Sequence, residues 1–482
     1  MKQLNGRCAE KKSQSRRAAK VAKTRKQIIT AARAVFIRHP FAAAGIRLIE
    51  EAGGFNHSSI YYHFNTKSEL FKEVVSELYQ EYLDVSREIL GGLGQKPLKE
   101  DLSEAIDRLL DFGFKKPDIL KVMMLNIGET VNIDEMTDGF YYFRKYNETI
   151  YSLFSLNKAF RATRKQVTMW IAAFQIVIAN YLGSPALFRQ ALCMDSDETV
   201  YRRFIKESLM LIFYPPLKAL LFPDLHPPRQ SFGGKRKKIQ AINSGKYLAA
   251  KGPPPSTKGD ISRARILEVA RSIFGRTPYN AASIRMIGEA GDFDFTLLYH
   301  YFPTKADLFE AVMGEIFEEL SFFVKHITIE MNDESMQGSL SFLIESVVDY
   351  FWTHPQGFSV CMQNVAQVNN LEDFPGTRHL LAIVTSTQEA YRLPDNQAND
   401  EVRGIIYGMG TIVINLLGAS TFYGSILNID PQSDRYKRWV KDMMIFISYP
   451  ALQAHLTRWA DLYSKDVLST FSFNGPDHSE IR

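Results

Sequence analysis

The stretch SIYYHFNTKSELF, residues 59–71, recurs as LLYHYFPTKADLF at residues 297–309, 238 positions further along the chain. With the same shift, 22 of the 47 positions from 25 to 71 are identical to residues 263–309. Towards the end of each copy the shift becomes 235, and there Asn180 and Gly183 align with Asn415 and Gly418. The whole chain is therefore a tandem duplication. Because its period is so long, it is a pair of multi-helix units and not a solenoid of short repeats.

Each copy has the periodicity of short helices. Apolar residues recur at helical spacing from Ile28 to Phe36, and Pro40 then ends the helix. A second helix is predicted over 46–52, followed by a turn in which Gly53 and its counterpart Gly291 are expected to need positive φ. Helix caps follow at Asn56 and Asp294, and capping-box patterns at Thr66 with Glu69 and Thr304 with Asp307. The pattern predicts an all-α chain with a helix-turn-helix packed on a preceding helix in each copy.

Basic residues are concentrated in two segments. The chain has a formal net charge of +5, yet residues 1–26 hold ten Lys and Arg against one acidic residue. A second run, KRKK at 235–238, lies in a Pro- and Gly-rich stretch. We expect two mobile basic arms that contact the phosphate backbone of a nucleic acid. The alternative is that they are solvated tails that only aid solubility.

Several classes of protein are not expected. Cys8, Cys193 and Cys361 are scattered and have no His cluster, which argues for a reducing compartment and against a disulfide framework or a metal site. The N-terminus lacks the apolar core of a secretory signal, and the most apolar stretch, around 169–182, is interrupted by Gln175 and Asn180. No nucleophile–base pair or phosphate loop is recognisable. We therefore expect a cytoplasmic, nucleoid-associated protein that is not an enzyme and needs no cofactor, metal or membrane.

Segments 25–75 and 263–313 resemble the DNA-binding domain of TetR-family transcriptional repressors. In that family a short helix and a glycine turn lead to a pattern of Leu-Tyr-x-Tyr-Phe, then Lys and Leu, and both copies match it closely. Copy one departs at Ala44-Gly45, where the family places Thr-Ser before the second helix. The rest of each half is expected, from the family architecture, to be a helical ligand-binding and dimerisation domain. The predicted domains are 1–22 (basic arm), 23–75 (first DNA-binding), 76–222 (first regulatory), 223–258 (linker), 259–313 (second DNA-binding), 314–465 (second regulatory) and 466–482 (tail).

The resemblance implies a set of contacts to double-stranded operator DNA. Residues that open the third helix are expected to face bases: His57, Ser58 and Ser59 in copy one, and Phe295, Thr296 and Leu297 in copy two. Residues expected to touch phosphates are Arg47, Tyr61, Tyr62, His63 and Lys67 in copy one, and Arg285, Tyr299, His300, Tyr301 and Lys305 in copy two. Three alternatives compete with these roles: Tyr61 and Tyr299 as core residues, Lys67 as a solvated lysine, and His63 as a packing residue.

TetR-family proteins are homodimers, so the duplication predicts a pseudo-dimer within one chain. Four helices, at 165–182, 198–220, 401–417 and 435–452, are expected to form its bundle, and the first and third are apolar nearly all round. An extended linker of about 35 residues is long enough to join the halves. The predicted interface residues are Asn180, Gly183, Asn415 and Gly418. The asparagines either fix the pairing register or only cap and meet solvent. Association beyond the pseudo-dimer is left open.

The base-facing residues of the two copies differ, which predicts an operator with two unlike half-sites. The alternative is a sensor or scaffold whose second DNA-binding copy has decayed. A small apolar ligand could bind in the regulatory domains; the alternative, which is more frequent for Met and aromatic residues in helical domains, is a plain core. The candidate lining residues are Met123, Met124, Phe140, Tyr141, Tyr142 and Phe143, or Phe351, Trp352, Phe358 and Met362.

Overall fold

The computed structural model describes residues 2–128, 145, 148–152, 163–192, 194, 197–222, 257–330, 336–368, 374–379, 382 and 397–462. The predicted linker up to residue 256, the tail at 466–482, Cys193 and the candidate pocket residues 140–143 lie outside these ranges. Within them every regular element is a helix, as the sequence predicts.

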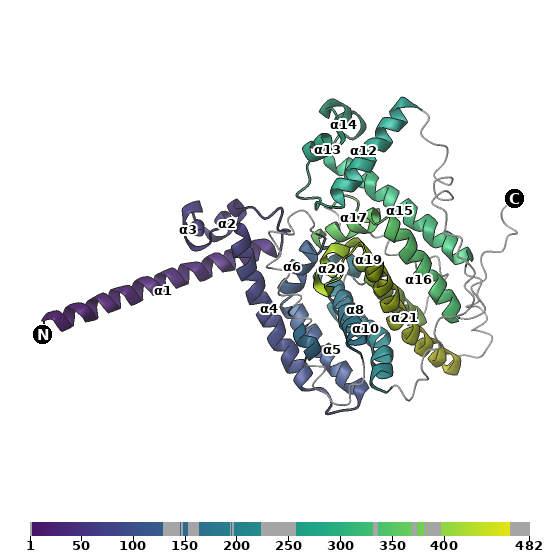
Figure 1. Cartoon of the computed structure of the whole chain (residues 1–482), viewed down its shortest axis with the longest axis horizontal. Coiled ribbons are helices and arrows are strands. Elements are labelled where there is room, and N and C mark those ends of the chain that lie inside the picture. Colours follow the sequence, from purple (N-terminus) through teal and green to yellow (C-terminus); the bar gives the residue numbers. More distant parts are fainter. Residues whose placement is uncertain are drawn as a thin grey trace.

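The two halves repeat the same order of helices (Figure 1). The first half contains α1 (Lys2–Phe36), α2 (Ile46–Gly53), α3 (His57–His63), α4 (Lys67–Gly91), α5 (Leu98–Lys115), α6 (Asp118–Asn126), α8 (Arg164–Gly183), α9 (Pro185–Ala191) and α10 (Glu198–Leu221). The second half contains α12 (Lys258–Phe274), α13 (Ile284–Gly291), α14 (Phe295–Tyr301), α15 (Lys305–Glu330), α16 (Met336–Thr353), α17 (Gln356–Asn364), the 3-10 turn η2 (Val365–Gln367), α19 (Gln397–Gly418), α20 (Ser420–Leu427) and α21 (Asp434–Leu462).

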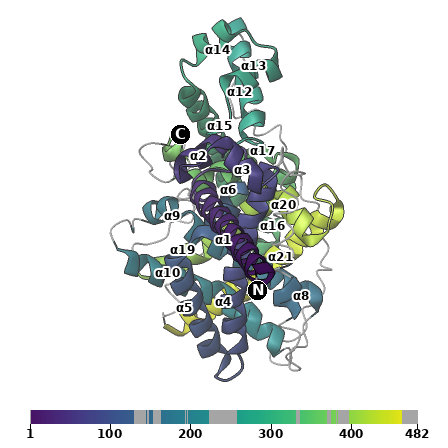
Figure 2. The same cartoon turned by 90° about the vertical axis from the view of Figure 1, so that its left-hand side faces the viewer.

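The halves join through a four-helix bundle of α8, α10, α19 and α21, in which each helix of one half packs against both helices of the other. Figures 1 and 2 show this bundle in the body of the molecule, with the short helices α2–α3 and α13–α14 at its periphery. The bundle explains why α8 is apolar nearly all round, because it is covered by its own half on one side and by the second half on the other. Although α8 has the length and composition of a membrane span, 78% of its most apolar window is buried inside the protein.

The bundle is not symmetric. On α19, Gly404 and Gly408 let α10 approach closely, since a Cβ atom on Gly404 would collide with Ser208 and one on Gly408 with Ile212. The equivalent positions on α8 carry Met169 and Ala173. We call the contact of α10 with α19 the first seam and the equivalent contact of α8 with α21 the second seam. The first seam therefore needs glycine, and the second does not. At the end of the second seam, Lys165 Nζ lies 2.5 Å from the Asp442 carboxylate, and this ion pair also joins the halves.

The four predicted interface residues divide into two groups. Asn180 Nδ2 donates to Asn415 Oδ1 at 3.3 Å, and both side chains are buried, so these residues meet between the halves. The glycines pack within their own halves. A Cβ on Gly183 would lie 2.8 Å from Met124 Cγ on α6, and one on Gly418 would lie 2.5 Å from Phe358 O on α17. Their role at the interface stays a prediction.

The N-terminal basic segment is helical and not a mobile arm. Helix α1 runs without a break from Lys2 to Phe36 and crosses the predicted domain boundary at residue 22. It projects well beyond the body, with the N-terminus at its far end (Figure 1). At about 1.5 Å per residue the segment before Lys23 extends the helix by about 30 Å. The basic residues of this segment therefore lie on the same helix that packs in the first DNA-binding domain.

Candidate nucleic-acid interface

Each helix-turn-helix is fixed by the caps that the sequence predicts. Asn56 accepts from the backbone N–H of Ser59 at 2.8 Å and begins α3, and Asp294 accepts from that of Thr296 at 2.6 Å and begins α14. The next helices begin at Thr66 and Thr304, whose hydroxyls accept from the N–H groups of Glu69 and Asp307. In copy one α2 begins at Gly45 without a side-chain cap, whereas in copy two the Ser283 hydroxyl accepts from Met286. The absent hydroxyl in copy one follows from its Ala44-Gly45 sequence.

The turn between the second and third helices has positive φ one residue later than predicted. Gly54 has φ 68° and Asp292 has φ 52°, whereas Gly53 and Gly291 end their helices. A left-handed residue commonly follows the last helical residue, and Asp tolerates this conformation because its side chain is short and polar. The two helical glycines are needed for packing, since a Cβ atom there would collide with the rings of Phe55 and Phe293 respectively.

The third helices present aromatic side chains to solvent. Phe64 and Phe302 are buried, but Tyr61 and Tyr299 are 39% and 51% exposed. The alternative that these tyrosines belong to the core is therefore wrong. They lie one helical turn after the first residue of α3 and α14, on the side that also carries the base-facing candidates. Tyr62 is 70% exposed as well, and His63 is partly buried with its ring edge-on to that of Tyr62.

The N-terminal face of α3 is polar and hydrogen-bonded. His57 Nδ1 lies 2.7 Å from a Glu50 carboxylate oxygen, and its ring lies 4.6 Å from that of Tyr61. Because the carboxylate favours a proton on Nδ1, neutral His57 would present Nε2 as an acceptor. Such an acceptor suits the amino group of adenine or cytosine in the major groove. Ser58 is exposed and donates to Asn56, and Ser59 beside it is half-buried.

The corresponding face of α14 is apolar and flanked by acids. Phe295 is 49% exposed, Thr296 is exposed and Leu297 is partly buried. Phe295 can pack on a thymine methyl group but cannot read a base edge by hydrogen bonds. Hydrogen bonds from the Thr296 side chain and backbone N–H to the Asp294 carboxylate keep its pKa below the usual value. His300 is exposed and Tyr301 is partly buried, with the two rings edge-on at 5.0 Å.

Lys67 and Lys305 are engaged inside the domain and are not solvated. Lys67 Nζ donates to the carbonyl of Phe41 at 2.9 Å and lies 4.1 Å from the centre of its ring. Lys305 Nζ donates to the carbonyls of Tyr279 and Ala282 and lies 4.2 Å from the Tyr279 ring. Each lysine thus ties the start of the fourth helix to the loop after the first. Their contact with phosphate stays a prediction. The hydrogen bonds in the structure show that both lysines hold the loop after the first helix of each copy.

The two copies differ in charge. Residues 19–75 contain nine Lys and Arg against four acidic residues, whereas the equivalent residues 257–313 contain seven of each. Arg47 and Arg285 stand at matching, highly exposed positions, each beside a glutamate one turn later. Because phosphate contacts dominate the electrostatics of DNA binding, the first copy has the stronger attraction.

A large cavity lies in the first regulatory domain among the described residues. Its volume is about 700 Å³, and the stacked rings of Trp170 and Phe174 form part of its wall. The lining is mostly apolar and comes largely from α4, α5, α8 and α10, with polar or charged side chains at Ser86, Arg87, Lys96, Asp101 and Gln175. None of the described pocket candidates lines it: Met124, Phe351, Phe358 and Met362 are buried core residues, Trp352 is partly buried, and Met123 lines a smaller pocket. For the described candidates other than Met123, the prediction is not supported, because apolar type alone does not separate core from cavity wall.

Comparison with protein families matches residues 28–74 and 266–312 to the domain described as bacterial regulatory proteins, tetR family. Both matches coincide with the helix-turn-helix units. Comparison with curated proteins gave no match. Within the described part of the chain, no group of three or more His, Cys, Asp or Glu side chains is arranged to hold a metal ion.

Proposed function

We propose that the chain, which carries the DNA-binding domain of tetR-family bacterial regulatory proteins twice, is a transcriptional repressor whose two fused halves grip two unlike half-sites of one operator. One observation carries this proposal: a single intrachain bundle joins two helix-turn-helix units whose exposed recognition faces differ. Its two matched domains support the role of a DNA-binding transcriptional regulator. Repression and the unlike half-sites are our inference, as are action in the cytoplasm and the absence of an enzymatic reaction.

The two recognition helices, α3 and α14, make different kinds of contact with DNA. Helix α3 presents His57, Ser58 and the exposed Tyr61, and it reads base edges by hydrogen bonds. Helix α14 presents Phe295 and Tyr299, and it selects thymine by apolar contact and holds the second half-site in place. Arg47 and Arg285 approach the phosphates near the second helices. The exposed residues Arg16, Arg17, Lys20, Lys23 and Lys26 of α1 add affinity that is independent of sequence, and this affinity falls with salt.

A small apolar ligand occupies the cavity of the first regulatory domain and releases the DNA. The support is its volume of about 700 Å³, which suits a drug-sized molecule, and its mostly apolar wall. The wall includes α8, which packs tightly on α6 where Gly183 meets Met124. A ligand that displaces α8 would therefore displace α6, and α6 contacts the first DNA-binding domain.

A second candidate function is a sensor or scaffold whose second copy no longer grips DNA. It is favoured by the zero net charge of residues 257–313 and by acidic Asp292 and Asp294 at the start of α14. In that case the first copy alone would carry the sequence preference.

Selection from randomised DNA tests the two candidates. We would compare the wild-type protein with two double variants, His57→Ala with Ser59→Ala, and Phe295→Ala with Thr296→Ala. All four side chains lie on the recognition helices and none belongs to the buried core. We expect the wild-type motif to have two unlike halves, and each double variant to relax the preference in one half only. Arg285→Ala, at a surface position, should weaken all sequences about equally.

Several results would contradict the proposal. A palindromic motif would show equivalent half-sites, and a single half-site would favour the scaffold with a decayed second copy. Light scattering of the complex adds the stoichiometry, for which we expect one chain per operator. Two chains on a minimal site would indicate a dimer of pseudo-dimers.

A further inference from the structure

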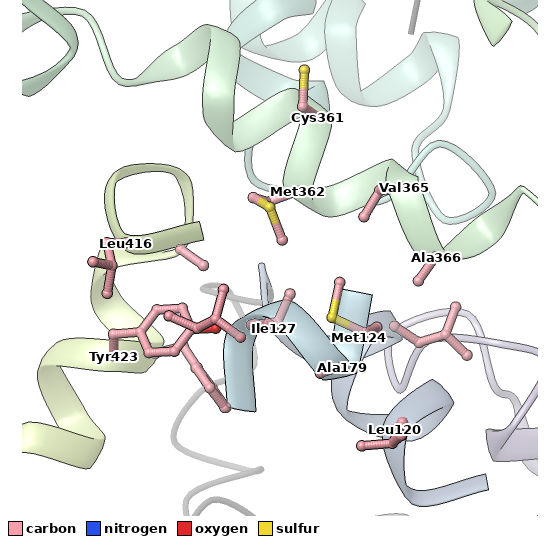
Figure 3. Packing of buried hydrophobic residues seen from close by; sticks show 14 of the residues in the cluster. Leu120, Met124, Ile127, Ala179, Cys361, Met362, Val365, Ala366, Leu416 and Tyr423 are labelled. Atoms are coloured by element: carbon pink, nitrogen blue, oxygen red, sulfur yellow. The ribbon is translucent and has the colours of Figure 1, made fainter. Parts of the chain in front are cut away.

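A shared layer lies between the two DNA-binding domains. It consists of α6 from the first half and α17 with η2 from the second, which pack against each other. Figure 3 shows Leu120, Met124 and Ile127 on the first side of this layer and Met362, Val365 and Ala366 on the second. All six side chains are buried. The contact is therefore close-packed and apolar, and its two sides do not slide freely past each other.

Each DNA-binding domain is hydrogen-bonded to this layer in the same way. The backbone N–H of Phe41 donates to Asn126 Oδ1 at 2.7 Å, and that of Tyr279 donates to Asn364 Oδ1 at 2.9 Å. Both asparagines are buried, and each donates from its amide to the carbonyl one helical turn earlier. Since the loops at Phe41 and Tyr279 are also the ones held by Lys67 and Lys305, the layer sets where each recognition helix stands.

One hydrogen bond across the layer has no counterpart by symmetry. Gln363 Nε2, from the second half, donates to the carbonyl of Gly128 in the first half, and the Gln363 side chain is 2% exposed. A Cβ atom on Gly128 would lie 2.8 Å from Gln363 Cδ, so the glycine leaves room for the amide. The position equivalent to Gln363 in the first half is Leu125, which cannot donate.

Further hydrogen bonds lead from Gln363 to the second DNA-binding domain. Gln367 Nε2 donates to the carbonyl of Gln363 at 2.8 Å and to Asn364 Oδ1 at 3.2 Å. Its Oε1 atom accepts from the backbone N–H of Asn280 at 3.3 Å, next to Tyr279. We call Gly128, Gln363 and Gln367 the clasp. It runs from the end of α6 in the first half to the loop of the second helix-turn-helix.

We propose that the clasp fixes the separation and orientation of the two recognition helices and thereby determines which half-site spacing the protein accepts. One added base pair moves a half-site by about 3.4 Å and turns it by about 35°, so a clasped protein tolerates few spacings. Without the clasp, the bundle and the apolar layer still hold the halves together, but no other hydrogen bond that the structure describes crosses the layer to fix how the two DNA-binding domains are turned. Gln363 is then a positioning residue that acts on DNA specificity without touching DNA. Its effect on spacing rests on the proposed function, whereas its effect on the geometry of the free protein does not.

Two measurements test the proposal on Gln363→Leu, which has nearly the same volume and copies the residue at the equivalent position in the first half. Gln356→Leu is the matched control, because Gln356 lies on the same helix and is exposed. Spin labels at Ala52→Cys and Ala290→Cys, equivalent exposed positions outside the DNA-contact candidates, report the distance between the domains without DNA. Cys8 and Cys193 are replaced by Ser so that the labels are specific.

We expect a narrow distance distribution for the unaltered clasp and for Gln356→Leu, and a broad or shifted one for Gln363→Leu. On operators with one base pair added or removed, the unaltered protein should lose affinity by at least about tenfold, and Gln363→Leu should lose several-fold less. If Gln363→Leu kept both the distance distribution and the spacing preference, the proposal would be overturned. If Gln363→Leu failed to fold, Gly128→Ala, which crowds the clasp from the other side, takes its place with the same expectation. If the protein failed to bind any operator, the distances would still decide whether the clasp holds the domains.

Discussion

Asn180 and Asn415 form a buried amide pair between the halves, and we expect the two residues to contribute unequally to stability. Asn415 Oδ1 accepts from Asn180 at 3.3 Å and from the hydroxyl of Tyr423 at 3.2 Å, so it serves two buried donors. Burial raises the pKa of Tyr423 well above its usual value, which keeps its hydroxyl protonated and in need of an acceptor. Asn415→Leu removes that acceptor from two donors. Asn180→Leu removes the long bond to Asn415 and a bond to the carbonyl of Ile176 one helical turn earlier, but it leaves Tyr423 with its acceptor.

The magnitudes follow from the cost of a buried polar group that loses its partner, which is about 1 to 3 kcal/mol. We expect Asn415→Leu to lower the free energy of unfolding by about 3 kcal/mol and Asn180→Leu to lower it by about 1 kcal/mol. Adding Tyr423→Phe to Asn415→Leu should recover about 1 kcal/mol, because it removes one of the two orphaned donors. The assay is equilibrium urea unfolding followed by the fluorescence of Trp170 and Trp439, which lie in the bundle. Equal losses for the two single variants, or no recovery with Tyr423→Phe, would refute Asn415 as the shared acceptor.

Two further predictions concern the glycines of α19 and the buried thiol of Cys361 on α17. Gly404→Ala should destabilise the bundle by about 1 to 3 kcal/mol through overpacking against Ser208, whereas Gly410→Ala on the same helix, which has open space around it, should gain about 0.5 to 1 kcal/mol. The midpoints of urea unfolding of the two variants measure these changes. A similar response of both glycines would count against tight packing of α19 on α10. Burial raises the pKa of the Cys361 thiol to about 12, so iodoacetamide at pH 8 should modify it only after unfolding. Peptide mapping by mass spectrometry reads this out, and rapid labelling of the native protein would show that the thiol is accessible.

The helix-turn-helix and its caps could be predicted from the sequence because their signals are local. An N-cap such as Asn56 acts on an N–H three residues away, and the duplication supplied every such signal twice. The bundle helices α8 and α19 were also predictable, since a helix buried on both sides must be apolar nearly all round. Position errors of one residue, as at Gly53 and Gly54, arise because the left-handed residue follows the helix and both residues are glycine.

The roles that depend on tertiary contacts could not be read in the same way. Lys67 looks like any lysine at a helix start until the fold brings the Phe41 carbonyl to its ammonium group. The helical state of α1 was missed because its first turns have no apolar stripe. Its many Lys, Arg, Ala and Gln residues have high helix propensity, however, and no proline occurs before Pro40. That composition was the available signal.

The asymmetry of the protein follows from its duplication within one chain. In a homodimer every substitution appears on both sides of the two-fold axis, so a glycine that tightens one seam must tighten the other as well. Fusion removes this constraint, and the two halves can differ at equivalent positions. Gly404 faces Ser208 at one seam, while the equivalent positions at the other seam hold Met169 and Met443. The clasp is one-sided for the same reason, and a body without two-fold symmetry has no reason to require a palindromic operator.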